Sequence, residues 1–465
     1  MNMINVRRLT VMTFLGAGML SGISAQVSPL QVDTLKETKI PAQWDLQSCI
    51  DYAKEQNITI RKNRITAAST QIDVKTAKAA LFPSLSFSTS QQVVNRPYQE
   101  TSSRVSGSEI ISSNSKTSYN GNYGLNASWT LYNGNKRLKT IQQEKLNNQV
   151  AELDVATSEN SIQESIAQIY IQILYAAESV RVNENTLQVS IAQRDRGQEL
   201  LNAGSIAKSD FAQLEAQVST DRYQLVTAQA TLEDYKLQLK QLLELDGENE
   251  MNIYLPALSD ENVLAPLPTK KDVYISALSL RPEIEASKLN VEASELGIGI
   301  AKSSYLPTIS LSAGIGTNHT SGSDFTFGEQ VKNGWNNSIG VSVSVPIFNN
   351  RQTKSAVQKA KLQRETSLLS LLDEQKTLYK TIEGLWLDAN SAQQRYAAAN
   401  EKLKSTQISY DLISEQFNLG MKNTVELLTE KNNLLQAQQE QLQAKYMAIL
   451  NTQLLKFYQG DKLAL

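Results

Sequence analysis

Hydrophobic and polar residues alternate along the stretch YNGNYGLNASWTLYNG, residues 119–134. Its odd-numbered positions are mostly Tyr, Leu, Ala and Trp, whereas its even-numbered positions are mostly Asn, Ser and Thr. Alternation at period two predicts a β-strand whose two faces meet different environments. The pattern recurs in three other stretches, so we predict two β-hairpins, 84–132 and 308–348, with polar loops at about 92–117 and 317–335.

Most of the remaining chain is rich in Gln, Glu, Lys and Ala, a composition that favours helices. We predict one helix at about 45–80 and another at about 270–304, each ending ahead of a proline, Pro83 or Pro307. Proline lacks the amide proton that a helix needs, and it disfavours helical geometry in the residue before it.

Two very long helices should begin near residues 136 and 352 and continue without proline to the sequences NAGS and NLGM. A helix of about 66 residues rises about 100 Å at 1.5 Å per residue. Beyond each glycine the chain should return as another helix, at about 207–245 and 424–458. Apolar residues in the first of these recur at spacings of three, four and seven, which predicts coiled-coil packing.

The strand–strand–helix plan occurs twice in the chain. NGNYGLNASWTLYNGN (120–135) resembles NNSIGVSVSVPIFNNR (336–351) at an offset of 216 residues. LNAGSIAKSDF (201–211) resembles FNLGMKNTVEL (417–427) at the same offset. The predicted order is therefore a signal peptide 1–25, a first repeat 26–245 with its turn near 204, a connector 246–269, and a second repeat 270–465 with its turn near 420.

The first residues combine two arginines, the apolar run LTVMTFLGAGML and the small residues SGISA. This order is typical of a secretory signal peptide, which we expect to be cleaved after Ala25. The apolar run is shorter than the roughly 20 residues that a membrane-spanning helix needs. The only cysteine, Cys49, lies in a predicted helix and not just after the signal, which argues against a lipoprotein.

Composition argues against nucleic-acid binding and against an enzyme. The formal net charge is −2, the sequence pI is about 5.8, and no basic cluster contains interleaved aromatic residues. The only histidine, His319, lies in a stretch that we predict to be a loop, so a Ser-His-Asp set, a thiol–imidazole pair and a His-rich metal site are all disfavoured. No phosphate-binding G-x-x-x-x-G-K-[ST] motif occurs. We expect no cofactor and no metal.

The predicted strands need a particular solvent on each face. In water the apolar face would need a covering layer, whereas in lipid the pattern is that of a barrel wall with a polar lumen. A small soluble β-sandwich that caps a coiled coil is the alternative. The residues expected to face lipid are Tyr123, Leu125, Trp129, Val341 and Val343. The residues expected to face the lumen are Asn120, Asn122, Asn126, Ser342 and Ser344.

Four strands cannot close a barrel, because open edges would leave backbone N–H and C=O groups unpaired in hydrocarbon. Single-chain barrels start at about eight strands. The chain must therefore associate with itself, and two copies would give eight strands while three would give twelve.

Two stretches carry a family resemblance that extends over nearly all of the mature chain. EQFNLGMKNTVELLTEKNNLLQAQQEQLQAKYMAILNTQLLKFYQG (415–460) and LLNAGSIAKSDFAQLEAQV (200–218) resemble the two helical turns of the TolC family of outer-membrane efflux factors. That family supplies the outer-membrane channels of tripartite efflux and type I secretion systems. The resemblance implies a mainly α-helical trimer with a twelve-stranded β-barrel and a twelve-helix periplasmic α-barrel. It also implies a periplasmic adaptor and an inner-membrane pump as partners.

The resemblance also implies a gate near the second turn. Phe417 stands where the family usually has Tyr, Lys422 where Arg is frequent, and Glu426 at an acidic position. Thr429 occupies a position that is acidic in some members. A phenyl ring cannot donate a hydroxyl hydrogen bond, and Lys lacks the bidentate fork of Arg, so this gate would have fewer fixed polar links.

At the first turn the gate candidates are Lys208 and Asp210. Gly204 and Gly420 should end the long helices in the left-handed conformation, and the turns that contain them are candidate docking surfaces for the adaptor. Exposed charges beside a helix turn are more often simply solvated, which is the plain alternative for all of these side chains.

The function predicted from the sequence is a passive exit duct across the outer membrane, gated at the periplasmic turns and used for small-molecule efflux. A type I protein secretion channel would use the same duct. A trimeric coiled-coil surface protein without a lumen and a soluble periplasmic scaffold or enzyme are the alternatives from other classes.

Overall fold

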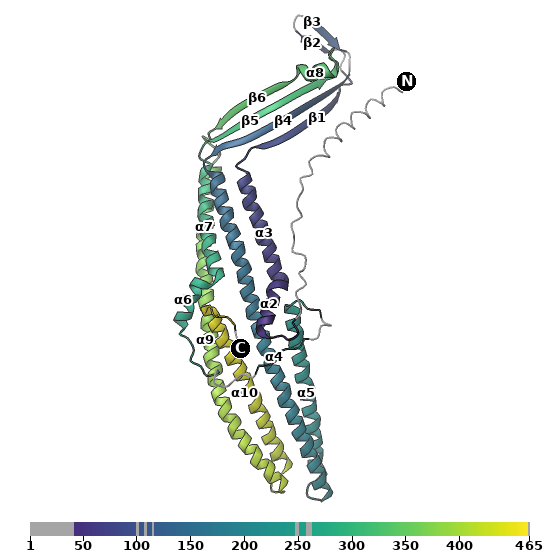
Figure 1. The fold of residues 1–465 in the computed structure, drawn as a ribbon, viewed down its shortest axis with the longest axis vertical. Helices are drawn as coiled ribbons and strands as arrows, with labels where there is room; N and C mark the ends of the chain where they lie inside the picture. Colours follow the sequence, from purple (N-terminus) through teal and green to yellow (C-terminus); the bar gives the residue numbers. More distant parts are fainter. Residues whose placement is uncertain are drawn as a thin grey trace, which may run out of the picture. The chain divides into compact units, whose positions relative to one another are not determined.

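The computed structural model describes residues 41–98, 102–106, 109–113, 116–246, 251–256 and 263–463. The expected signal peptide lies outside these residues. One compact unit comprises Gln43–Leu465, and all elements described below belong to it (Figure 1).

Long helices dominate this unit, and the strands form one small sheet and a separate two-stranded ribbon. The helices are α2 (Leu46–Gln56), α3 (Ile58–Ala79), α4 (Lys136–Asn202), α5 (Lys208–Leu242), α6 (Lys270–Leu280), α7 (Pro282–Ser303), α8 (Phe327–Asn333), α9 (Gln352–Asn418) and α10 (Thr424–Gln459). The strands are β1 (Ser84–Asn95), β2 (Ser102–Ser106), β3 (Glu109–Ser113), β4 (Thr117–Asn133), β5 (Thr308–Thr320) and β6 (Asn336–Ser344). In the described part of the chain, none of the helices combines the length and the apolar character needed to cross a membrane.

The two helices expected to be continuous, at 45–80 and 270–304, are each broken in two. Asn57 separates α2 from α3, and its side chain accepts hydrogen bonds from the first amides of α3. Pro282 is the first residue of α7, where a missing amide proton costs nothing, and α6 ends two residues earlier. Both breaks therefore have local causes.

The two long helices are of equal length, as expected. α4 and α9 each contain 67 residues and begin 216 residues apart. Each forms a hairpin with the helix that follows it, α5 or α10, and the sheet lies at the opposite end of α4 and α9 from these turns (Figure 1). Nearer the sheet, α3, α4, α7 and α9 pack side by side in that order.

The four-stranded sheet is antiparallel, with strand order β1-β4-β5-β6. β1 and β4 are longer than expected, and β2 and β3 pair with each other inside the predicted polar loop 92–117. α8 occupies part of the other predicted loop, 317–335. β6 ends at Ser344 because Pro346 cannot donate a ladder hydrogen bond, so the second hairpin is shorter than the predicted 308–348.

The largest apolar core lies midway along the helices. It contains Trp44, Cys49, Tyr170 and Tyr396, and the connector reaches it through the buried Val263 and through a parallel bridge between Trp44 and Ile253. Burial raises the pKa of the Cys49 thiol to about 12, so this cysteine stays protonated at neutral pH and packs as an apolar residue.

Candidate functional site at the helical turns and the sheet faces

The two turns between the long helices share one backbone geometry. Gly204 has a φ of +72° and Gly420 a φ of +74°. Just beyond each glycine an amide donates back to the helix, from Ser205 to the Leu200 carbonyl (2.8 Å) and from Met421 to the Gln416 carbonyl (2.9 Å). These are the bonds of a helix ending with a left-handed glycine, so the expected conformation of both glycines is confirmed.

At the second turn Lys422 and Glu426 form an ion pair with 2.6 Å between Nζ and Oε1. Glu426 also closes a capping box with Asn423, whose amide donates to Oε2 (3.2 Å) and whose side chain accepts from the Glu426 amide (2.9 Å). The hydrogen bond from Lys422, followed by that from the Asn423 amide, lowers the pKa of Glu426. Two of the predicted gate residues are thus brought together by the first turn of α10.

The first turn has a simpler arrangement. Asp210 accepts a hydrogen bond from the Ala207 amide (3.3 Å), while Lys208 is exposed. Among the ion pairs of the described residues, none joins Lys208 to Asp210. The two turns therefore share a backbone but differ in charge chemistry.

Phe417 is buried, unlike the other gate candidates. Its ring packs with Leu214 of α5 and Leu427 of α10, and Leu200 and Leu428 surround this apolar cluster. Thr429 is exposed and donates its hydroxyl proton to the Val425 carbonyl (2.7 Å). Phe417 thus contacts both hairpins, whereas Thr429 bonds only within its own helix.

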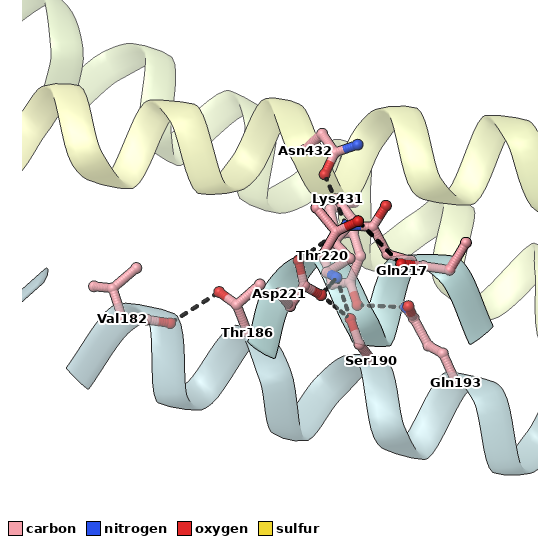
Figure 2. Close-up of polar contacts among 11 residues, drawn as sticks. Val182, Thr186, Ser190, Gln193, Gln217, Thr220, Asp221, Lys431 and Asn432 are labelled. Carbon is pink, nitrogen blue, oxygen red and sulfur yellow. Dashed lines mark hydrogen bonds and ion pairs between the residues drawn. The ribbon is translucent and has the colours of Figure 1, made fainter. Parts of the chain in front are cut away.

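A buried polar cluster joins the two hairpins somewhat farther from the turns than Phe417 does, and it was not predicted from the sequence (Figure 2). Lys431 of α10 forms an ion pair with Asp221 of α5 and donates a hydrogen bond to Ser190 of α4. The side chains of Asp221 and Lys431 are only 1% and 3% exposed. We call Ser190, Asp221 and Lys431 the charged seam.

Heptad spacing contained the signal for the charged seam. Asp221 follows the buried Leu214 by seven residues, and Lys431 follows the buried Leu427 by four, so both charges occupy inward positions of their helices. Burial lowers the pKa of Lys431, and the hydrogen bond and charge of Asp221 oppose this shift without cancelling it.

The sheet separates the two sets of strand residues onto opposite faces. Leu125 pairs with Phe87 and Ile315, and Leu311 pairs with both Trp129 and Val341, which places the apolar residues together. On the other face the pairs are Asn126 with Ser86 and Gly314, Ser342 with Ser310, Ser344 with Thr308, and Asn122 and Asn120 with Ser90 and Gln92. Most of these apolar side chains are exposed in the single chain.

Tyr123 lies on the apolar face but is half-buried. It stacks on His319, with 5.9 Å between ring centroids, and His319 in turn contacts Phe327 of α8 at 5.0 Å. The expectation that His319 lies in a loop was wrong, because β5 continues through Thr320 and buries the imidazole over Gly121. α8 therefore covers the apolar face beside Tyr123 but not beside Leu125.

Residues 49–244 and 273–460 match the sequence pattern of the family described as "Outer membrane efflux protein". The outer membrane efflux protein BepC of Brucella suis biovar 1 (strain 1330) is 25% identical over 294 residues, which cover 63% of this chain and 61% of BepC. The outer membrane protein TolC of Escherichia coli (strain K12) is 23% identical over 311 residues, which cover 65% of this chain and 62% of TolC. The matched region thus spans less than two thirds of either relative.

The fold itself is similar to that of a solved structure over nearly the whole chain. A crystal structure of CusC superposes with a TM-score of 0.76 at 18% sequence identity, covering 92% of this chain and 96% of that one. At this level of identity the similarity concerns the fold alone.

Proposed function

Because the chain belongs to the outer membrane efflux protein family, we propose that it forms a passive exit duct across the outer membrane. Three copies would build a twelve-stranded β-barrel in the membrane and a twelve-helix tunnel in the periplasm. A periplasmic adaptor and an inner-membrane pump would deliver the cargo, which we propose to be small molecules. The gate would lie at the α4–α5 and α9–α10 turns, with Lys208, Asp210, Phe417, Lys422 and Glu426 as its residues.

The same proposal assigns a role to each segment of the chain. A signal peptide at 1–25 would direct export and be removed. The repeats 26–245 and 270–465, joined by the connector 246–269, would each supply two barrel strands and one long hairpin. Gly204 and Gly420 would present the turns to the adaptor.

One observation carries the proposal: the sheet and the helix row are open on the same two sides. β1 and β6 are the edges of the sheet, and α3 and α9, which lead into β1 and out of β6, are the edges of the row. A neighbouring copy that pairs its β6 with β1 would also bring its α9 beside α3. The sheet would then close into a barrel only when the helix row also closes into a tunnel.

Exposed apolar residues on the two edge helices support this arrangement. Ile58, Ile65 and Ile72 follow one another at seven-residue spacing along α3, and Leu362 and Leu369 do so along α9. Seven-residue stripes are typical of coiled-coil interfaces, and among the described residues no other helix covers these two.

The faces of the sheet then acquire distinct environments. In the proposed barrel Leu125, Trp129, Val341 and Val343 face lipid, and Tyr123 lies where α8 begins to cover that face. Asn120, Asn122, Asn126, Ser342 and Ser344 face the lumen, where water satisfies their polar groups. Apolar residues outward and polar residues inward are what a membrane barrel requires.

The mass of the purified full-length protein in mild detergent tests the assembly. We expect a particle of three chains, each of 51.5 kDa before the signal peptide is removed. A stable monomer would contradict the proposal, because its sheet edges would be unpaired in hydrocarbon. A particle of two chains would replace the twelve-stranded barrel with an eight-stranded one.

Conductance across a planar lipid bilayer tests the lumen. We expect ion conductance from the purified trimer, whereas a coiled-coil surface protein of the same mass would conduct nothing. Loss of resistance to toxic small molecules in a deletion strain separates small-molecule efflux from protein secretion, since a dedicated secretion channel would leave that resistance unchanged.

A further inference from the structure

Two kinds of contact join the α4–α5 hairpin to the α9–α10 hairpin near the turns. The first is the apolar cluster around Phe417. The second is a polar layer in which the charged seam is flanked by Gln193–Tyr410 (2.9 Å) and Gln217–Asn432 (3.5 Å). Among the described residues, Lys431–Asp221 is the only ion pair that joins the two hairpins.

Each member of the charged seam is hydrogen-bonded to another in this structure (Figure 2). Lys431 and Ser190 both donate to Oδ2 of Asp221, and Gln217 donates to Oδ1 (2.9 Å). The seam thus fixes the register of three helices, α4, α5 and α10. A shift of α5 or α10 along its axis would separate the two buried charges, and a shift of α4 would take the Ser190 hydroxyl away from both of them.

The energetics of the charged seam differ from those of an apolar contact. Burial lowers the pKa of Lys431 despite the adjacent carboxylate, so the ammonium group loses more from dehydration than it gains from Asp221. If the hairpins separate, both charges regain water, which offsets the lost ion pair. Apolar side chains at the same positions would gain nothing from separation and would hold the hairpins together.

We propose that the charged seam is a release contact: it sets the register of the two hairpins when they are packed and lowers the cost of separating them. The inference rests on the proposed duct, in which the hairpins must move apart near the turns to open the gate. With a buried lysine and aspartate at these positions, instead of two leucines, the hairpins would separate and repack more readily.

The test compares three variants of the full-length protein in planar bilayers. For Asp221→Leu/Lys431→Met we expect equal or higher thermal stability but spontaneous opening reduced about tenfold or more relative to wild type. For Lys431→Met, which leaves Asp221 unpaired, we expect more frequent opening. The exchanged pair Asp221→Lys/Lys431→Asp should lie closest to wild type.

The matched control removes a lysine–carboxylate ion pair from within one hairpin. Lys402 of α9 and Glu440 of α10 lie 2.7 Å apart and are exposed. Lys402→Met/Glu440→Leu removes the same two charges without touching the contact between hairpins, so its opening frequency should match that of wild type.

A distance measurement keeps the inference testable without conductance. Spin labels at Ser205→Cys and Met421→Cys report the separation of the two turns when labelled chains are diluted with unlabelled ones. The native Cys49 is buried, so it should remain unlabelled. The double apolar variant should lose the longer distances, and Lys431→Met should gain them.

The outcomes separate the release contact from the duct. If the double apolar variant opens as readily as wild type, the release contact is refuted while the duct stands. If no variant conducts but the distances change as expected, the duct is refuted and the release contact stands. Should Lys431→Met fail to fold, the double variant, expected to be the more stable one, decides the matter.

Discussion

Two glycines of the second repeat differ in whether their backbone conformation accepts a side chain. Gly420 has a φ of +74°, where a Cβ strains the backbone although space around it is free. Gly384 lies within α9 and also has free space around it. A methyl group should therefore act only through the backbone at both positions, which isolates the cost of the left-handed turn.

We predict that Gly420→Ala lowers the free energy of unfolding by about 1–2 kcal/mol. Gly384→Ala should raise it by about 0.5–1 kcal/mol, because glycine is a poor helix former. Denaturant unfolding of the two variants and wild type measures both changes. Equal effects of the same sign would show that the turn does not need a glycine.

At this scale the sequence was informative where the chemistry is local. A glycine after a long helix predicts its own conformation, and Gly204 and Gly420 adopt it. The burial of Lys431 and Asp221 was not predicted, although both lie at inward heptad positions, because charged residues in helices are ordinarily solvated. Only the packing of three helices removes water from them.

The edge helices α3 and α9 expose apolar residues that a neighbouring copy would bury. Their apolar stripes run along sides of the helix row that no other helix of the described chain covers. Because α3 runs toward the sheet and α9 away from it, a neighbour's α9 would meet α3 in antiparallel orientation. This pair of helices would bury the apolar stripes of α3 and α9, as an antiparallel coiled coil does.

We predict that Ile65→Ser shifts the purified protein from trimer to smaller species. Its side chain is 60% exposed at the centre of the α3 stripe, and a buried hydroxyl would replace apolar contact between the two helices. Mass in mild detergent measures the shift. The control is Ile275→Ser in α6, which is 55% exposed but lies off the edge helices, and its trimer should remain intact.

The sequence predicted the ends of the long helices, because glycine there allows a turn. It did not predict the break between α6 and α7, although Pro282 carried the signal. The ribbon β2–β3 and helix α8 were missed because Ser- and Gly-rich stretches predict loops. For α8 a signal was present, since Thr326 and Glu329 form a capping box at its start.

At the scale of the whole molecule, the proposed threefold axis multiplies every charge at the turns by three. Glu426 of three copies would form an acidic ring around the gate, and Lys422 would partly neutralise each carboxylate at 2.6 Å. Such a ring favours cations in the narrowest part of the lumen. The gate would therefore be selective as well as closed.

We predict that Glu426→Gln lowers the cation preference of the open channel and raises the conductance of the closed one. Reversal potentials in a salt gradient measure the preference. Glu233→Gln is the control, because Glu233 is also exposed and pairs with a lysine of its own helix, Lys236 (2.7 Å), but lies far along α5 from the turn. Unchanged selectivity in Glu426→Gln would remove Glu426 from the gate.

The cation preference of the wild-type channel should depend on pH in a definite direction. The hydrogen bonds from Lys422 and the Asn423 amide lower the pKa of Glu426, so its carboxylate stays charged below the ordinary value of 4.5. Cation preference should therefore persist as the pH falls through 4.5 and disappear only below it.

The open sides of the sheet and of the helix row also link the folding of the chain to its assembly. A chain whose strands and helices are completed only by its neighbours has no folded form suited to lipid on its own, so folding, association and insertion become one equilibrium. Mass action then makes the stability of the assembly depend on protomer concentration. In the proposed trimer the concentration of assembled ducts rises with the cube of the free protomer concentration, so modest changes in synthesis would alter the number of ducts steeply wherever free protomer predominates.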